Sequence, residues 1–252
     1  DSNYSFEFDG VGDCFDVGLV TALNGASTFT ISTWVNADVL TASTDYVFFS
    51  VATDSTHRLH VEFYGTTIRV NVSNDVSQAY QDFNYNGGAF AISTWYHVAV
   101  VFDGGVGTPA DRVILYVNGT PQTVASTTGT YPATTPTFVT NTFLGSYSGG
   151  TLGIVGEQSN TAIWNSALSA ANILSIYNNG RPGDLTSLSP THWWRMGEEA
   201  FCPDYTATPN VWTIPDQIGS NDGTSAGNPD LVGEAPGSNA NGLSDSMDID
   251  SR

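Results

Sequence analysis

Apolar and polar residues alternate along much of the first 164 residues of the chain. The alternation is clear in residues 4–8 and 29–35, and further β-rich runs follow at 46–51, 59–64 and 67–72. A period of two residues indicates β-strands with one face buried and the other in solvent. Many short strands separated by Gly, Asn, Asp and Thr predict an all-β sandwich or barrel.

Two further runs refine this prediction. Residues 95–102 are apolar on both faces, which indicates a central strand that is covered on both sides. Residues 113–117 lead into Asn118-Gly119, a pair that suits a type I′ turn because both central residues of that turn need positive φ. We therefore expect a hairpin at this position.

One helix is predicted over residues 170–179. Ser169 is suited to the N-cap, and apolar residues recur at i, i+3 and i+4 from Ile173. Gly180 suits the C′ position, and Pro182 prevents the helix from continuing.

The composition changes after about residue 186. Residues 192–196 are predicted as one more strand, and prolines then recur among many Gly, Asn, Asp and Ser. We therefore divide the chain into a domain at 1–186 and a C-terminal strand with an extended, Pro/Gly/Asn-rich arm at 187–252. The arm is expected to pack on the domain or on a neighbouring copy.

The charge balance limits the partners that the chain can bind. Its 25 acidic and 6 basic residues give a net charge of −19. Such a charge repels phosphate backbones and anionic membrane surfaces, so we expect neither nucleic acid nor membrane as a partner. No run of 18 apolar residues is present, so no membrane span is expected. The same charge favours divalent cations near loops that gather carboxylates.

The chain has two cysteines, Cys14 and Cys202. In an extracellular protein they could form one disulfide that closes most of the chain, and this pairing is the prediction that we carry forward. The alternative is two separate buried thiols, because spacing alone does not show proximity.

Four segments follow one another in an order typical of one family. They read FDGVGD at residues 8–13, FTISTWV at 29–35, WYHVAVVFDG at 95–104 with LYVNG at 115–119, and AIWNSALS at 162–169. In this order they resemble the laminin-G-like, concanavalin A-like lectin/glucanase superfamily, in its bacterial and phage branch. The resemblance covers residues 4–180. It implies an antiparallel two-sheet jelly-roll sandwich that is extracellular or lies on a virion surface.

Two features depart from the family pattern. Residues 158–160 read Gln-Ser-Asn where the family usually has Ile-Asp-Glu, which weakens an acidic role there. Residues 193–197 and 216–224 are similar to the leader that normally precedes the first motif, but here they follow the domain. Either the module is arranged in an offset order, or a second copy begins.

The acidic residues are not spaced for glycoside cleavage. Enzymes of this fold use a Glu-x-Asp-x-Glu strand, because alternate residues place the nucleophile and the acid/base on one face. No two of the six Glu are two to five residues apart. His97 is expected to be a core imidazole, and no G-x-S-x-G elbow is present. We therefore expect no enzymatic activity.

The resemblance implies Ca²⁺ as the metal. Asp9, Gly10 and Asp13 form a short acidic turn at a strand end, where family members often hold Ca²⁺ with help from the closing strand, and Glu157 is the nearest acid on that strand. The alternative is a solvated turn in which Asp9 makes local backbone hydrogen bonds.

The predicted ligand site is the loop at residues 73–88, which holds Tyr80, Phe83 and Tyr85 among Asn, Gln and Asp. Aromatic rings offer flat faces to sugar rings, and neighbouring amides supply directional hydrogen bonds. The alternative is that these rings pack on their own domain. We expect a non-catalytic surface recognition or adhesion module that binds glycan with or without Ca²⁺. The rival expectation is a structural subunit of a phage surface or a filament that self-associates through residues 187–252.

Overall fold

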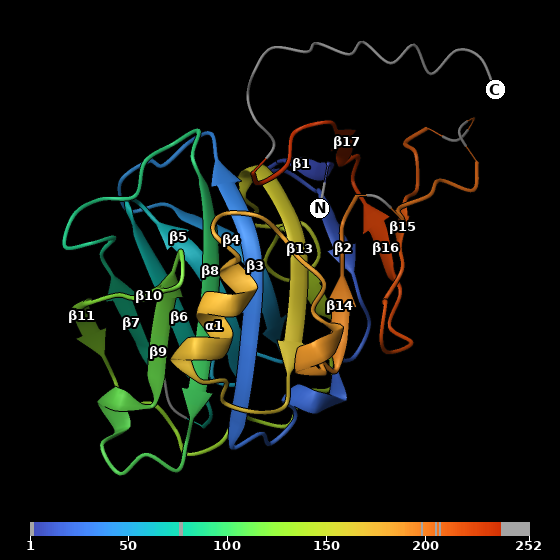
Figure 1. The fold of residues 1–252 in the computed structure, drawn as a ribbon. Helices are drawn as coiled ribbons and strands as arrows, with labels where there is room; N and C mark the ends of the chain where they lie inside the picture. The colour runs from blue at the N-terminus through green and yellow to red at the C-terminus, as the bar shows by residue number, and fades with distance from the viewer. Residues whose placement is uncertain (1–2, 76–77, 198, 205, 207, 238–252) are drawn as a thin grey trace.

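The protein is a sandwich of two antiparallel sheets that pack face to face (Figure 1). The computed structural model describes residues 3–75, 78–197, 199–204, 206 and 208–237. One sheet has eight strands: β1 Ser5–Asp9, β3 Thr28–Ala37, β8 Trp95–Asp103, β9 Val113–Val117, β10 Thr120–Pro121, β13 Val155–Trp164, β14 His192–Trp194 and β17 Asp230–Val232. The other has nine: β2 Cys14–Asp16, β4 Asp45–Ala52, β5 Arg58–Tyr64, β6 Thr67–Ser73, β7 Tyr80–Phe83, β11 Val124–Thr128, β12 Thr142–Leu144, β15 Thr213–Ile214 and β16 Gly223–Ala226.

The strand order places distant segments side by side. The eight-stranded sheet runs β10-β9-β8-β3-β13-β1-β17, with β14 also paired to β13. The nine-stranded sheet runs β11-β7-β6-β5-β4-β12-β2-β16-β15. The 3-10 helices η1 Thr21–Leu23, η2 Pro109–Asp111 and η3 Thr186–Leu188 lie in connections. The all-β fold expected from the alternating pattern, and the antiparallel two-sheet sandwich implied by the family resemblance, are confirmed.

The core lies between the two sheets and is rich in aromatic rings. Phe6 of β1 and Phe15 of β2 meet edge to face with 4.7 Å between ring centroids, so opposite sheets touch directly. Phe29 and Phe102 stack at 5.0 Å within the eight-stranded sheet. Burying such rings is the main stabilising contribution of a sandwich, since each removes a large apolar area from water.

The helix α1 (Ala170–Tyr177) covers the outer face of the eight-stranded sheet (Figure 1). Ile173 and Ile176 pack there against Val101 of β8 and Trp164 of β13. This second layer explains why the β8 sequence is apolar on both faces. The predicted cap is also confirmed, because the Ser169 side chain accepts a hydrogen bond from the backbone of Asn172.

Two turn predictions have different outcomes. The hairpin turn after β9 is confirmed, since Asn118 and Gly119 have φ of 50° and 76°. The helix, however, ends earlier than predicted: Asn178 already has φ of 46° and is the C-cap, before Gly180 is reached. Asparagine tolerates the left-handed conformation, so glycine is not required at the first position after the helix.

The described part of the segment after residue 186 packs on the domain, as one of the two expectations had it, and the strand predicted at 192–196 forms as β14, but the rest is not an extended arm. β14 pairs with β13, β16 pairs with β2, and β17 pairs with β1, so this segment adds strands to both sheets of the same domain. Its prolines and glycines lie in the connections between these short strands. Residues 238–252, which the predicted arm includes, lie outside the described residues.

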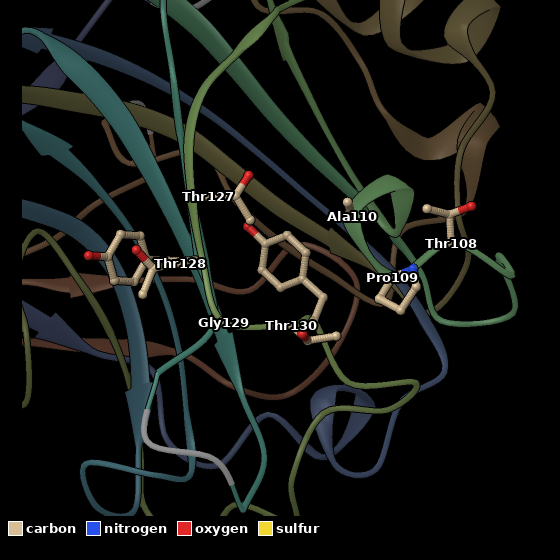
Figure 2. Close-up of a pocket in the computed structure, with 9 residues that line it drawn as sticks. Thr108, Pro109, Ala110, Thr127, Thr128, Gly129 and Thr130 are labelled. Carbon is tan, nitrogen blue, oxygen red and sulfur yellow. The ribbon is translucent and has the colours of Figure 1, made fainter.

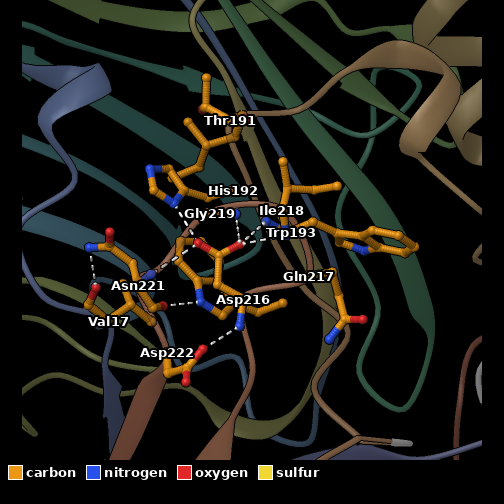
Figure 3. Close-up of polar contacts among 12 residues, drawn as sticks. Val17, Thr191, His192, Trp193, Asp216, Gln217, Ile218, Gly219, Asn221 and Asp222 are labelled. Carbon is orange, nitrogen blue, oxygen red and sulfur yellow. Dashed lines mark hydrogen bonds and ion pairs between the residues drawn. The ribbon is translucent and has the colours of Figure 1, made fainter.

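The Asp216 carboxylate holds this C-terminal segment in place (Figure 3). Its oxygens accept hydrogen bonds from the backbone of Trp193, Gly219 and Asn221, and Nδ1 of His192 lies 2.7 Å away. The segment that resembles a family leader therefore completes the same sandwich. This arrangement agrees with the offset order rather than with the start of a second copy.

The predicted disulfide is also wrong: Cys14 and Cys202 are two free, buried cysteines. Cys14 lies in β2, where its pKa is raised by burial. The Sγ of Cys202 instead donates to the Asp204 carbonyl within the connection between β14 and β15. The two cysteines are thus separate buried thiols, which is the alternative considered above.

Candidate functional site: the outer face of the nine-stranded sheet

Polar and aromatic side chains gather on the outer face of the nine-stranded sheet. Along β5, Leu59, Val61 and Phe63 enter the core, so the alternate residues point outward. The outward residues of β5 are Arg58, His60, Glu62 and Tyr64, and those of β6 and β7 include Arg69, Asn71, Tyr80 and Asp82. Register fixes which of them meet, since Arg69 lies opposite both Glu62 and Asp82.

Arg69 organises one end of this face. Its guanidinium carbon lies 3.6 Å from the Tyr64 ring centroid and 4.1 Å from the Tyr80 ring centroid, so two rings flank the cation. Its Nε donates to Asp82 at 2.7 Å. Asp45 and Glu62 each lie 3.8 Å from Nη1. Burial and the nearby Glu62 charge raise the pKa of Asp45.

Beside this cluster lies a depression of about 170 Å³. It is lined by Arg58, His60, Asn71 and Tyr80 of the sheet and by Tyr147 from the loop between β12 and β13. The His60 and Tyr147 rings meet edge to face with 5.6 Å between centroids. A shallow site with aromatic walls and polar groups on its floor suits a polar ring-shaped ligand such as a sugar.

Several buried polar atoms of this face have no hydrogen-bond partner among the described residues. They are Nε of Arg58, Nδ1 of His60 and Oδ1 of Asp45. Buried polar atoms are normally paired, because an unpaired one costs free energy. These atoms lie on residues that line the depression.

Of the three aromatic residues predicted to bind ligand, the structure places only Tyr80 on this face. Phe83 is 1% exposed and belongs to the core. The Tyr85 ring packs on Phe90 and Tyr96, with centroid distances of 5.4 and 5.0 Å. Tyr80 and Phe83 lie on opposite faces because β7 is a strand, not a loop.

Sequence reasoning missed Tyr64, Tyr147, His60 and the two arginines. A signal was available in β5, whose sequence RLHVEFY places polar or aromatic residues at every second position. Tyr147 had no comparable signal. It lies far from β5 in the chain and reaches the site only through the position of its loop.

The acidic turn predicted to hold Ca²⁺ is closed by hydrogen bonds that its own carboxylates accept. Asp13 accepts from the backbone of Asp9 at 3.0 Å and of Asn228 at 2.6 Å, one bond to each oxygen. Asp9 accepts from the backbone of Val11 at 2.6 Å. Asp9 thus accepts within the turn, Asp13 accepts both within the turn and from the connection between β16 and β17, and burial raises the pKa of Asp13. Gly10 lies against β13, where an added Cβ would come within 2.6 Å of Cγ2 of Val155.

Glu157 lies apart from this turn. Its Cα partners are Glu7 in β1 and Asn36 in β3, whereas Asp9 faces Val155. Burial raises the pKa of Glu157 to about 7, helped by the charges of Asp38, Glu234 and Glu7. Across the described residues, no group of three or more His, Cys, Asp or Glu is arranged to hold a metal ion. The calcium site expected from Asp9, Gly10, Asp13 and Glu157 stays a prediction.

Two larger depressions lie elsewhere on the surface. One, of about 290 Å³, lies between η2 and β11 and is lined by four threonines, Pro109, Ala110 and Gly129 together with Tyr80 and Tyr131 (Figure 2). The other, of about 380 Å³, lies beside Trp193. There Nε1 of Trp193 donates to Asn160, and Arg195 is paired with Glu199.

The fold and this polar face define a jelly-roll sandwich of the lectin type. The family model described as "Concanavalin A-like lectin/glucanases superfamily" matches residues 9–174, and the chain belongs to this family. A search of the curated proteins found no match. Among the part of the chain that the structure describes, no helix is long and apolar enough to cross a membrane.

Solved structures share the fold at low sequence identity. A candidate carbohydrate binding protein from Bacteroides ovatus has a TM-score of 0.62 at 14% identity, covering 93% of this chain and 61% of that one. A heptameric SAP-like pentraxin from Limulus polyphemus has a TM-score of 0.54 at 15% identity, over 92% and 94% of the two chains. The CBM40 of a Ruminococcus gnavus IT-sialidase has a TM-score of 0.53 at 15% identity, over 69% and 96%. At these identities the likeness shows the fold alone.

Proposed function

We propose that this protein is a non-catalytic glycan-binding module and that it binds through the outer face of the nine-stranded sheet. The observation that carries the proposal is the depression beside Tyr80 and Tyr147, whose lining residues include buried polar atoms that have no hydrogen-bond partner among the described residues. Sugar rings offer apolar faces to aromatic side chains and hydroxyl groups to polar ones, which matches this mixture.

The carboxylates of the face support binding rather than bond cleavage. Asp82 and Glu62 both lie against the Arg69 guanidinium, and Asp82 also accepts from the Ser126 hydroxyl at 2.7 Å. Carboxylate oxygens that already contact a guanidinium or a hydroxyl are engaged in holding the face together. Several relatives of the fold are carbohydrate-binding modules by name, which favours a role at an extracellular surface.

A glycan array followed by calorimetry with the tightest ligand tests the proposal. Tyr80→Ala should weaken binding by about tenfold or more, because a central aromatic contact commonly contributes over 1 kcal/mol. Tyr80→Phe should retain most of the affinity, since the ring remains. Tyr177→Ala removes a tyrosine of the opposite sheet's helix and is the matched control. An array without any bound glycan, or equal losses in Tyr80→Ala and Tyr177→Ala, would refute the proposal.

Calcium dependence remains a prediction, and the same array tests it. Binding measured with a chelator should equal binding with added Ca²⁺ if the outer face acts alone. A loss of binding in chelator would show that a cation is needed after all. Asp13→Asn would then distinguish the 9–13 turn from other positions.

A further inference from the structure

The edges of the two sheets differ in how well they are protected. Unpaired strand edges attract other strands, so proteins usually shorten them or add proline or charge. In the described chain, β10 ends the eight-stranded sheet with two residues, one of them Pro121, and β17 ends it with three residues that include Asp230. β15 ends the nine-stranded sheet with two residues.

β11 is the exception among these edges. It has five residues, Val-Ala-Ser-Thr-Thr, all exposed, with neither proline nor charge. Its one protective feature is an irregular register between Val124 and Ser126. Threonine and valine also favour the extended conformation, so the strand is well suited to accept another one.

The charge distribution points to a second copy as the strand that β11 accepts. Between Arg112 and Glu157 the sequence has no Asp, Glu, Lys, Arg or His, although the whole chain carries a net charge of −19. Two such acidic molecules repel each other, so they can approach most closely where both surfaces are neutral. The nearest acid on the neighbouring strand, Asp82, is paired with Arg69.

We propose that β11 is a homodimer interface in which the strands of two copies pair antiparallel. A two-fold axis near Ser126 brings Val124 of one copy opposite Thr128 of the other. Val124 is 46% exposed, and Thr128 lines the cavity of about 290 Å³ between β11 and η2 (Figure 2). The same surface therefore supplies an apolar side chain and a cavity lined by uncharged residues, as a self-complementary two-fold contact requires.

The proposed pairing has a consequence for ligand binding. Antiparallel strands related by a two-fold axis keep the same face of the sheet on the same side, so the two nine-stranded sheets would join into one. Both copies of the Tyr80 face would then point in one direction. A surface that displays many glycans could engage both at once, which raises apparent affinity without new contacts. The dimer itself does not depend on glycan binding.

Sedimentation velocity over a range of protein concentrations tests the interface. The wild-type protein should dimerise as concentration rises, and added salt should strengthen the dimer because it screens repulsion between acidic copies. Val124→Glu should raise the dissociation constant of the dimer by about tenfold or more, since it puts like charges into a neutral contact. Val139→Glu is the matched control: it is 74% exposed and lies in the same uncharged segment but outside β11.

Single cysteines locate the contact independently. Ser126→Cys should form a disulfide-linked dimer, and so should a mixture of Ala125→Cys and Thr127→Cys, because these residues face each other about the two-fold axis and facing antiparallel residues lie within disulfide range. The native thiols of Cys14 and Cys202 are buried and do not compete. A wild-type protein that stays monomeric at every concentration overturns the proposal. So does a dimer that both glutamate variants weaken equally, or one that none of these cysteines crosslinks.

Discussion

Nδ1 of His192 lies 2.7 Å from Oδ2 of Asp216, and this contact joins β14 of the eight-stranded sheet to the turn that precedes β16 of the nine-stranded sheet (Figure 3). The Asp216 side chain is fully buried. Because it also accepts several backbone hydrogen bonds, this one carboxylate ties the C-terminal segment to both halves of the sandwich.

Asp216→Asn should therefore destabilise the protein by about 2–3 kcal/mol, since hydrogen bonds to a buried charged group are among the strongest in proteins. The amide would also turn donor hydrogens toward backbone N–H groups. Urea denaturation measures the change. Asp230→Asn, at an exposed position of β17, is the control and should have little effect. Equal stability of the two variants would contradict the role given to Asp216.

The same residue predicts a dependence of stability on pH. Burial alone would raise the pKa of Asp216, but the contact with His192 and the backbone hydrogen bonds lower it to about 2. A lowered folded-state pKa adds stability above the unfolded value of about 4. This stability is lost as pH falls through the folded value. Urea denaturation between these two pH values should show a steeper decline for the wild type than for Asp216→Asn.

Glu157 makes stability depend on pH in the opposite direction. Burial raises its pKa to about 7, so the folded protein prefers the protonated acid. Its favourable contribution is complete below the unfolded pKa and is lost as pH rises through about 7. Glu157→Gln should therefore stabilise the protein at alkaline pH by on the order of 1–2 kcal/mol, with little change at acidic pH. A variant that is less stable than the wild type at alkaline pH would count against this account.

The buried His97 should remain neutral across the stable pH range. Burial lowers its pKa to about 3, and its Nε2 lies 2.8 Å from the Ser32 hydroxyl. Proton NMR of the imidazole should show no titration near the ordinary value of about 6.5. A midpoint near that value would show that the ring is accessible to solvent.

Arg69→Lys should weaken both stability and glycan binding, although the charge is retained. An ammonium group lacks the planar guanidinium that lies between Tyr64 and Tyr80 and donates to Asp82. We expect a loss of about 1–2 kcal/mol in the free energy of unfolding. Arg181→Lys, at an exposed position, is the control. Equal behaviour of the two variants would show that charge alone matters at position 69.

Much of the fold could be predicted because each strand carries its own local pattern. Residues 29–35 and 67–72 alternate regularly, and β3 and β6 contain them with one or more residues added at an end. The Asn118-Gly119 pair specified its turn through the positive φ that both residues adopt. The family motifs then supplied the arrangement of the two sheets.

The C-terminal strands could not be predicted in the same way. β15 has two residues and β17 has three, which is too short for a periodic pattern. β17 forms on the edge that β1 presents around Phe6, and β15 forms on β16, which itself pairs with β2 at Phe15. The candidate site was predicted in part for a similar reason. Tyr80 followed from its aromatic neighbourhood, whereas Tyr147 reaches the site only through tertiary structure.

The most direct test of the account is to locate a bound glycan by backbone amide chemical shifts in a labelled protein. Saturating glycan should shift the amides of β5, β6 and β7 together with the loop around Tyr147, and should leave the helix α1 and the 9–13 turn unchanged. Shifts confined to the turn or to the surface around Trp193, with none on β5 to β7, would contradict the central claim.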